Sequence, residues 1–168
     1  MHHPAPTSPA TWCADWRIED IALRHADTEV EQRACFAVMH ELRPHLKNED
    51  EFLDRIGRQG RQDYRILAAW EGDQVVALAG YRFQENLVYG KFLYVDDLVS
   101  ASEQRGKRWG ERLLKALEGV ALQAGCVRLV LDTGMANALA QRFYFRQGLL
   151  TGSLRFGKPI GVLPGGAT

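Results

Sequence analysis

A short basic segment is the first place in this sequence where residue types and spacing suggest binding chemistry. Two glycines are interleaved with cationic side chains in a run of seven residues: Gln104, Arg105, Gly106, Lys107, Arg108, Trp109 and Gly110. If a helix begins there, its N-terminus presents unsatisfied N–H groups and a positive dipole end, and glycines let the backbone approach a ligand. The segment therefore predicts a pyrophosphate site. A basic helix-capping loop with a solvated face is the alternative.

A second set of residues lies further along the chain, on a predicted helix. Asn137, Ala140 and Tyr144 are three and four residues apart, which places them on one helical face. A polar, a small and a phenolic side chain on one face suit a surface that contacts a long, thin ligand. Taken without the basic segment, Tyr144 is better interpreted as an amphipathic tyrosine that packs in the core, which is the commoner role of a helical tyrosine.

The residues for acid–base chemistry are less sharply indicated. Asp96 and Asp97 are adjacent on a predicted strand, where successive side chains face opposite sides, so at most one is expected in a given cleft. Asp97 is the candidate general base. The alternatives are a solvated or loop-ordering carboxylate, with a water chain removing the proton. His40 and His45 are expected to be surface or packing residues.

The elements that must position these residues follow from periodicity, capping residues and turns. Strands are expected at 16–24, 64–70, 74–83, 91–99, 127–131 and 149–156. Helices are expected at 28–42, 49–56, 106–124 and 136–147. Turn residues at 71–73 indicate an antiparallel hairpin, and the nearly all-apolar run 127–131 is typical of a strand covered on both faces. This order predicts a mixed α/β sheet, not a doubly wound Rossmann unit.

Composition bounds the classes of protein to which the chain can belong. Its 168 residues are 46% hydrophobic and 25% charged, which is normal for one globular domain, expected at 16–156. We expect residues 1–15 to be a flexible Pro-rich lead-in and residues 157–168 to be a Gly/Pro-rich tail. Lys plus Arg and Asp plus Glu both number 21, so no global field favours nucleic acid or a membrane as partner.

The cysteines and the N-terminus indicate the compartment. Cys13, Cys35 and Cys126 form no disulfide or zinc pattern, so reduced thiols and no metal are expected. The first residues lack a basic stretch followed by an apolar run, so neither a signal peptide nor a membrane anchor is expected. We therefore expect a cytoplasmic protein.

The two motifs together resemble those of the GNAT superfamily of N-acetyltransferases. Its first signature reads Arg/Gln-x-x-Gly-x-Gly/Ala; Arg105 and Gly110 fill the first and last positions, and Arg108 replaces the first glycine. Its second reads Asn-x-x-Ala-x-x-Phe/Leu-Tyr-x-x-x-Gly-Phe, which the sequence matches from Asn137 to Gly148, with Leu149 in place of the final Phe. The resemblance covers about 16–156. It implies a mostly antiparallel twisted sheet flanked by helices, with splayed parallel central strands.

The resemblance also implies a reaction. An amine would attack the thioester of acetyl-CoA directly in a ternary complex, without a Cys or Ser nucleophile and without a metal. Leu98 and Val99 would pair with the pantetheine arm, a backbone N–H near Val99 would polarise the carbonyl, and Tyr144 would protonate the leaving thiolate. The acceptor would be a small amine or a protein or peptide amine, and a homodimer is compatible with the family. A non-catalytic acyl-CoA-binding or regulatory domain is the alternative function.

Overall fold

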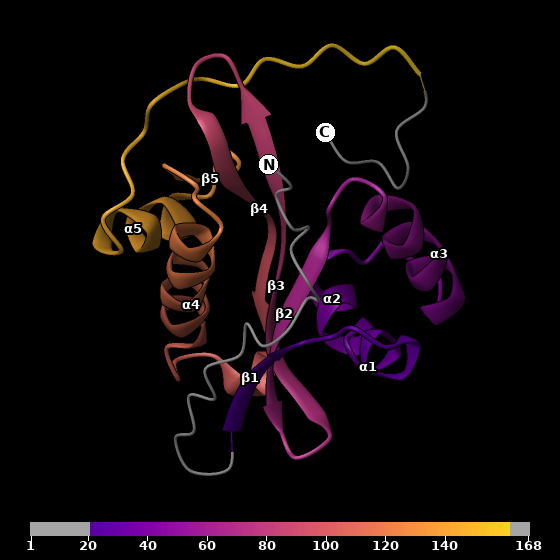
Figure 1. Cartoon of the computed structure of the whole chain (residues 1–168). Helices are drawn as coiled ribbons and strands as arrows, with labels where there is room; N and C mark the ends of the chain where they lie inside the picture. The colour runs from indigo at the N-terminus through magenta and orange to yellow at the C-terminus, as the bar shows by residue number, and fades with distance from the viewer. Residues whose placement is uncertain (1–20, 162–168) are drawn as a thin grey trace, which may run out of the picture.

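The structure is a computed structural model, and it describes residues 21–161 (Figure 1). Its strands are β1 (Ile21–His25), β2 (Arg65–Glu71), β3 (Gln74–Asn86), β4 (Gly90–Ser100) and β5 (Leu129–Leu131). Its helices are α1 (Glu29–Ala34), α2 (Phe36–Leu42), α3 (Glu49–Gly60), α4 (Trp109–Gln123) and α5 (Ala138–Arg146), with a short 3₁₀ helix, η1 (Ser102–Gln104). The predicted mixed α/β class is confirmed.

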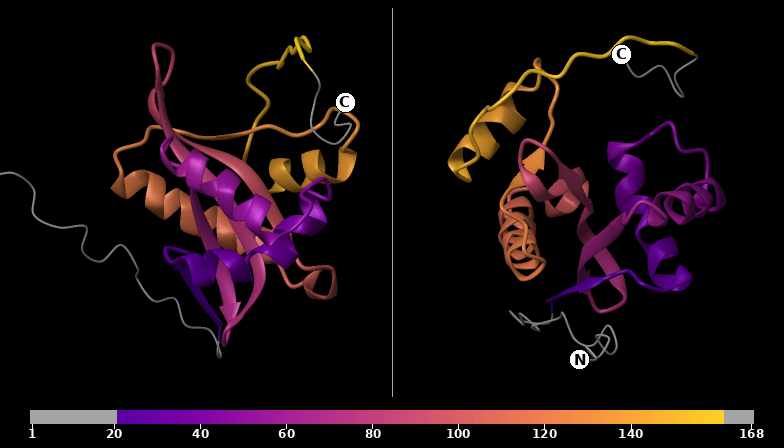
Figure 2. Two further views of the ribbon diagram at one scale, coloured as in Figure 1. Left: turned by 90° about the vertical axis from the view of Figure 1, so that its right-hand side faces the viewer. Right: turned by 45° about the horizontal axis from the view of Figure 1, so that its top comes forward.

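One sheet organises the described residues, in the order β1-β2-β3-β4-β5. All neighbouring strands are antiparallel except β4 and β5, which are parallel. Helices α1 to α3 lie on one side of the sheet, and α4 and α5 lie on the other (Figures 1 and 2). The sheet therefore separates the molecule into two halves, and each half has its own hydrophobic core.

The central strands supply side chains to both cores, because residues alternate between the faces of a strand. On β2, Ile66, Ala68 and Trp70 belong to the core under α1–α3, whereas Leu67 and Ala69 belong to the core under α4. The helix α4 faces the sheet with a buried stripe at four-residue spacing: Trp109, Leu113, Leu117 and Ala121. This two-sided burial is why the strand sequences read as continuous apolar runs.

Capping residues mark the ends of three helices where the sequence predicts them. Thr28 caps α1 in a full capping box with Glu31, and Asn48 caps α3 by accepting a hydrogen bond from the Glu51 N–H. Gly125 follows α4 with a φ of 72°, in the left-handed region that glycine adopts without strain. The hairpin between β2 and β3 forms as expected, with its turn at 72–73.

The helix expected at 28–42 is in fact two helices. The chain changes direction at Cys35, whose side chain is fully buried. Because of this break, α1 packs against α3 while α2 packs against β3 and β4. Periodicity alone could not show the break, since the apolar residues keep helical spacing through it.

The C-terminal part of the sheet is smaller than expected. The strand predicted at 127–131 forms only at Leu129–Leu131, its residues are half-buried, and Val127 is exposed, so full cover on both faces was wrong. The strand predicted at 149–156 does not form, and the chain from 149 to 160 has no regular structure. Consequently β5 lies at the edge of the sheet. Its parallel pairing with β4 is as expected.

The ends of the chain mostly fall outside the described residues. The lead-in at 1–15, the first residues of the predicted strand at 16–24, and residues 162–168 are not described. No helix within residues 21–161 is both long and apolar enough to cross a membrane.

Candidate active site

The basic segment predicted to bind pyrophosphate, residues 104–110, lies between the end of β4 and the first turn of α4, and we call it the anion loop. The loop is held to α2 by Glu41, which accepts hydrogen bonds from the Ser102 N–H and hydroxyl, at 3.1 and 3.2 Å, and pairs with Arg105 at 3.4 Å. The first backbone hydrogen bond of α4 runs from Arg112 to the carbonyl of Arg108. Nothing in the sequence pattern had indicated Glu41 as the residue that holds the loop.

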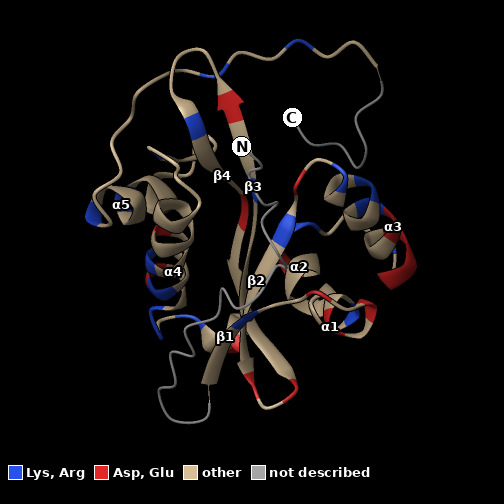
Figure 3. Cartoon of the chain, viewed as in Figure 1, with Lys and Arg blue, Asp and Glu red and all other residues tan. Residues whose placement is uncertain are grey.

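The N-terminus of α4 presents free donors. Among residues 21–161, the backbone N–H groups of Trp109, Gly110 and Glu111 have no hydrogen-bond acceptor, as expected for the first turn of a helix. Arg105 and Lys107 are exposed beside them, and Figure 3 shows basic residues gathered at this end of α4. These donors and charges fit a pyrophosphate group, because oriented N–H groups and a helix dipole both stabilise an anion.

Arg108 explains why a glycine is common at its position. Its φ is 62° and its ψ is 27°, a left-handed conformation that L-residues adopt only with strain. Its guanidinium turns back along α4 and binds both carboxylate oxygens of Glu111, at 2.7 and 2.8 Å. The side chain is therefore committed to its own helix and leaves the backbone donors uncovered.

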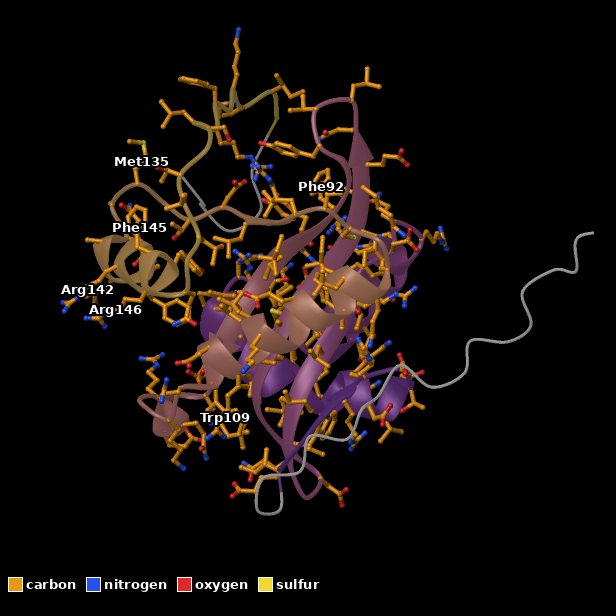
Figure 4. The ribbon with its side chains drawn as sticks, turned by 60° about the vertical axis from the view of Figure 1, so that its left-hand side comes forward. Phe92, Trp109, Met135, Arg142, Phe145 and Arg146 are labelled. Carbon is orange, nitrogen blue, oxygen red and sulfur yellow. The ribbon has the colours of Figure 1, made fainter. Side chains whose placement is uncertain are left out.

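Trp109 and Gly110 serve the loop through packing. The Trp109 side chain is buried at the start of α4 (Figure 4), and its indole Nε1 has no hydrogen-bond partner among the described residues. A Cβ added to Gly110 would lie 3.0 Å from the ring of Phe143 on α5. Only glycine lets α5 approach α4 this closely.

The helix α5 carries the second predicted set. Asn137 is its N-cap and accepts a hydrogen bond from the Ala140 N–H at 3.2 Å, so its side-chain oxygen is already used within the helix. Tyr144 is half-buried beside Phe143, and its hydroxyl has no hydrogen-bond partner among residues 21–161. Burial raises the pKa of Tyr144, so the phenol is protonated at neutral pH and can donate.

The strand β4 is unpaired along part of one edge. It pairs with β5 only from Leu93 to Val95, and from Asp96 onward its outer edge has no strand partner within the described chain. Leu98 and Val99 lie in this stretch, bonded to β3 on the other edge only. We call the point where the two strands separate, after Val95 and Leu131, the fork.

Asp96 and Asp97 do not face opposite sides of the sheet, so that expectation was wrong. The β3–β4 register shifts between Gly80 and Tyr81, which leaves Asp96 as an extra residue in a β-bulge. Both carboxylates then lie on the side of α2 and α3. Asp96 pairs with Arg82 at 2.8 Å, and Asp97 pairs with Arg43 at 2.7 Å.

Asp97 sits in a tight buried cluster. Its Oδ2 accepts a hydrogen bond from the Tyr64 hydroxyl at 2.8 Å, and its Oδ1 accepts one from Arg43. Burial and the Asp97 charge raise the pKa of Tyr64 well above its usual value, so this hydroxyl stays a donor. A Cβ on Gly80 would lie 2.1 Å from the Tyr64 hydroxyl, so the cluster fits only over a glycine.

A cavity of about 440 Å³ opens on the same side of the sheet, beside the fork. It is lined by Arg43, Arg82, Gln84, Tyr94, Asp96, Asp132 and Arg155. Tyr94 donates a hydrogen bond to Asp132 at 2.7 Å, and Arg155 binds both of them. Burial is the main cause that raises the pKa of Tyr94 to about 12.

Sequence reasoning did not identify most of these cavity residues. They come from five separate segments, and the only local signal was the Asp96-Asp97 pair on β4. Within residues 21–161, no three His, Cys, Asp or Glu side chains converge as metal ligands would.

Known proteins share this architecture. An uncharacterised N-acetyltransferase of Bacillus subtilis is 28% identical over 142 residues, which are 83% of this chain and 99% of the relative. An aminoalkylphosphonate N-acetyltransferase of Salmonella typhimurium is 31% identical over 147 residues, which are 82% and 90% of the two chains. A solved aminoglycoside N-acetyltransferase in complex with CoA has the same fold, with a TM-score of 0.74 at 14% identity over 87% of this chain and 99% of that one.

The family itself is identified by the extent of the match. Residues 17–149 match the acetyltransferase (GNAT) family, a span that includes the anion loop, the fork and α5. Because the family model matches most of the chain, this protein belongs to the GNAT family of acetyltransferases.

Proposed function

We propose that the protein transfers an acetyl group from acetyl-CoA to a primary amine within a ternary complex. The observations that support the proposal are the free donor set at the start of α4, the close approach of Phe143 on α5 to Gly110, and the unpaired β4 edge at the fork. Tyr144 follows Phe143 on α5. Family membership supports acetyl transfer to an amine.

Different segments of the chain would bind different parts of acetyl-CoA. The N–H groups of Trp109, Gly110 and Glu111 would hold the pyrophosphate, with Arg105 and Lys107 adding positive charge. The free edge of β4 at Leu98 and Val99 would pair with the pantetheine arm as an added strand. Acetyl-CoA supplies the thioester carbonyl that the amine attacks.

Tyr144 is proposed to be the general acid. In the transfer, the amine nitrogen forms a bond to the carbonyl carbon, the carbon–sulfur bond breaks, and the sulfur takes a proton. The Tyr144 hydroxyl has no other partner among the described residues, and its raised pKa keeps the proton available. A backbone N–H near Val99 would stabilise charge on the carbonyl oxygen.

Asp97 is proposed to be the general base. Asp97 remains our prediction from the sequence, but both of its oxygens are engaged, one by Arg43 and one by Tyr64. To accept a proton from the amine, Asp97 would have to give up one of these bonds or act through water. Replacement by Asn keeps the size and removes the charge, so a base role predicts loss of the acidic limb of the rate profile.

A titration followed by a transfer assay tests the proposal. We expect acetyl-CoA to bind and to raise the melting temperature, and release of free CoA thiol to depend on an added amine. Binding with no amine-dependent release across amines of different charge would favour the alternative, a non-catalytic acyl-CoA-binding domain. Absence of binding by folded protein would overturn both functions.

A further inference from the structure

The cavity beside the fork is lined by charges of both signs, three arginines and two aspartates. Each of the three arginines belongs to an ion pair: Arg82 with Asp96 and Arg155 with Asp132, all four of which line the cavity, and Arg43 with Asp97, which lies behind the lining. A ligand with only positive charge would meet three guanidinium groups there, and a ligand with only negative charge would meet the carboxylates. The lining therefore matches a ligand that carries one charge of each sign.

Two of the three pairs are fixed in place. Arg82 binds both oxygens of Asp96 and also donates to Gln59 and Gln62 on the side of α3, so its donors are engaged. Asp97 is locked by Tyr64 and Arg43. Arg43 donates through Nε and Nη2, while its Nη1 has no partner among residues 21–161. This leaves Arg43 with one free donor group on the cavity.

The third pair can open. The side chains of Arg155 and Asp132 are 74% and 41% exposed, and exposed ion pairs of this kind contribute little stability. Arg155 belongs to the irregular segment after α5, so its backbone is held by no helix or strand. Asp132 directly follows Leu131, the last residue of β5 paired with β4, and so stands at the fork where the acyl group is expected.

We propose that the acceptor is a small zwitterionic amine, whose amino group binds at Asp132 and whose carboxylate, phosphonate or phosphate binds Arg155 and the free Nη1 of Arg43. This assignment rests on the proposed acetyl transfer, since it places the amine at the fork. The substrate exchanges the Arg155–Asp132 pair for two pairs of its own, so no charge is left unpaired. Polyamines lack the anionic group and are poor ligands.

Binding measured by calorimetry, with and without free CoA, tests the class of acceptor separately from turnover. The probes are 2-aminoethylphosphonate and 3-aminopropanoate, with n-propylamine and spermidine as amines without an anionic group. We expect the two zwitterions to bind at least tenfold more tightly than the other amines. Propylamine or spermidine binding as tightly as the zwitterions would overturn the proposal.

Variants assign the two ends of the ligand. Arg155→Ala should weaken 2-aminoethylphosphonate binding by roughly tenfold to a hundredfold, the range for hydrogen bonds to charged groups. The matched control is Arg58→Ala, which removes an exposed arginine of α3 that makes no ion pair within residues 21–161. Equal affinity of wild type and Arg155→Ala, with both folded by thermal melt, would overturn the role of Arg155.

The Asp132→Asn variant should change the affinities for two ligands in opposite directions. It should weaken binding of 2-aminoethylphosphonate, because the amino group loses its carboxylate partner. It should strengthen binding of methylphosphonate, which has no amino group, because the Asp132 carboxylate no longer competes for Arg155. Weakening of both ligands would overturn the assignment of the amine to Asp132. If zwitterions bind but none is acetylated, the proposed acetyl transfer is overturned and the proposed class of ligand is supported. If all amines are acetylated equally well, acetyl transfer is supported and the zwitterionic class of acceptor is overturned.

Discussion

Tyr144 and Tyr64 show how a half-buried and a buried phenol in one protein differ in what they can do. The Tyr64 hydroxyl donates a hydrogen bond to Asp97 inside a buried cluster, so it is not available to a ligand. Tyr144 is half-buried, packs on Phe143 and keeps its hydroxyl free among the described residues. Burial raises the pKa of both groups, but only Tyr144 has a proton to give to a ligand.

Replacing Tyr144 with Phe therefore separates catalysis from binding. The ring that packs on α5 stays, so the affinity for acetyl-CoA should be unchanged, whereas kcat should fall at least about tenfold, since general acids contribute 10²–10⁴-fold and water substitutes in part. Steady-state kinetics and a cofactor titration check the two halves. Unchanged kcat, with no burst phase to indicate slow product release, would return Tyr144 to a packing role.

Arg108 has a left-handed backbone conformation, which glycine adopts with less strain than arginine. Arg108→Gly should remove the left-handed strain at φ 62° and lose only an exposed pair with Glu111. We expect the melting temperature to rise by roughly 2–4 °C, with cofactor affinity preserved. Lys107→Gly, at a residue without positive φ, is the control and should not stabilise. A lower melting temperature for Arg108→Gly would mean that the Glu111 pair matters more than the strain.

At the scale of elements, the site depends on how closely two helices meet. The first turn of α4 supplies the donors and α5 supplies Tyr144, and the two helices touch where Gly110 faces Phe143. A glycine within a helix is usually unfavourable. Here it sets the spacing between the anion loop and the phenol.

Two glycine substitutions in α4 should have opposite effects. Ala at Gly119 meets nothing within 4 Å, so it should stabilise the fold by up to about 1 kcal/mol through helix propensity. Ala at Gly110 meets Phe143 at 3.0 Å, and overpacking of about 1–3 kcal/mol should cancel or exceed that gain. Chemical denaturation measures both. Gly110→Ala should also weaken acetyl-CoA binding, and equal stabilisation by the two variants would contradict the close-contact argument.

At the scale of the whole molecule, a contact between His25 and Tyr81 links strand β1 to the core under α4. His25 on β1 contacts the Tyr81 hydroxyl at 2.8 Å, and Tyr81 is buried in the core under α4. Burial lowers the pKa of His25 below its ordinary value. Global stability should therefore depend on pH through this strand, at the end of the sheet away from the fork.

The direction of the dependence follows from proton linkage. Below pH 6.5 the unfolded chain protonates His25 while the folded protein does not, so the free energy of unfolding should fall as pH drops from 6.5 toward the lowered folded pKa. The slope cannot exceed about 1.4 kcal/mol per pH unit for one proton. His25→Asn should flatten this slope between pH 7 and 5 in urea titrations. An equal slope in both proteins would assign it to other groups.

The sequence by itself determined the parts of the protein that depend on neighbours along the chain. The hairpin turn at 72–73, the caps at Thr28 and Asn48, and the stripe of α4 are all set by local backbone and side-chain preferences. The family, and the order of elements apart from the break at Cys35 and the missing strand at 149–156, followed from these local features together with the two signatures. The start of α4 at the anion loop was predictable because it depends on one local segment, and anion binding by its first turn stays a prediction.

Only the tertiary structure decided which side chains share the cavity. The bulge at Asp96 shifts the alternation of β4, and it arises from pairing with β3, which no count along one strand can reveal. Asp132 and Arg155 meet Tyr94 because β5 pairs with β4 and the chain after α5 returns to it. The strand predicted at 149–156 is absent for the same kind of reason, since an apolar run becomes a strand only where a partner edge binds it.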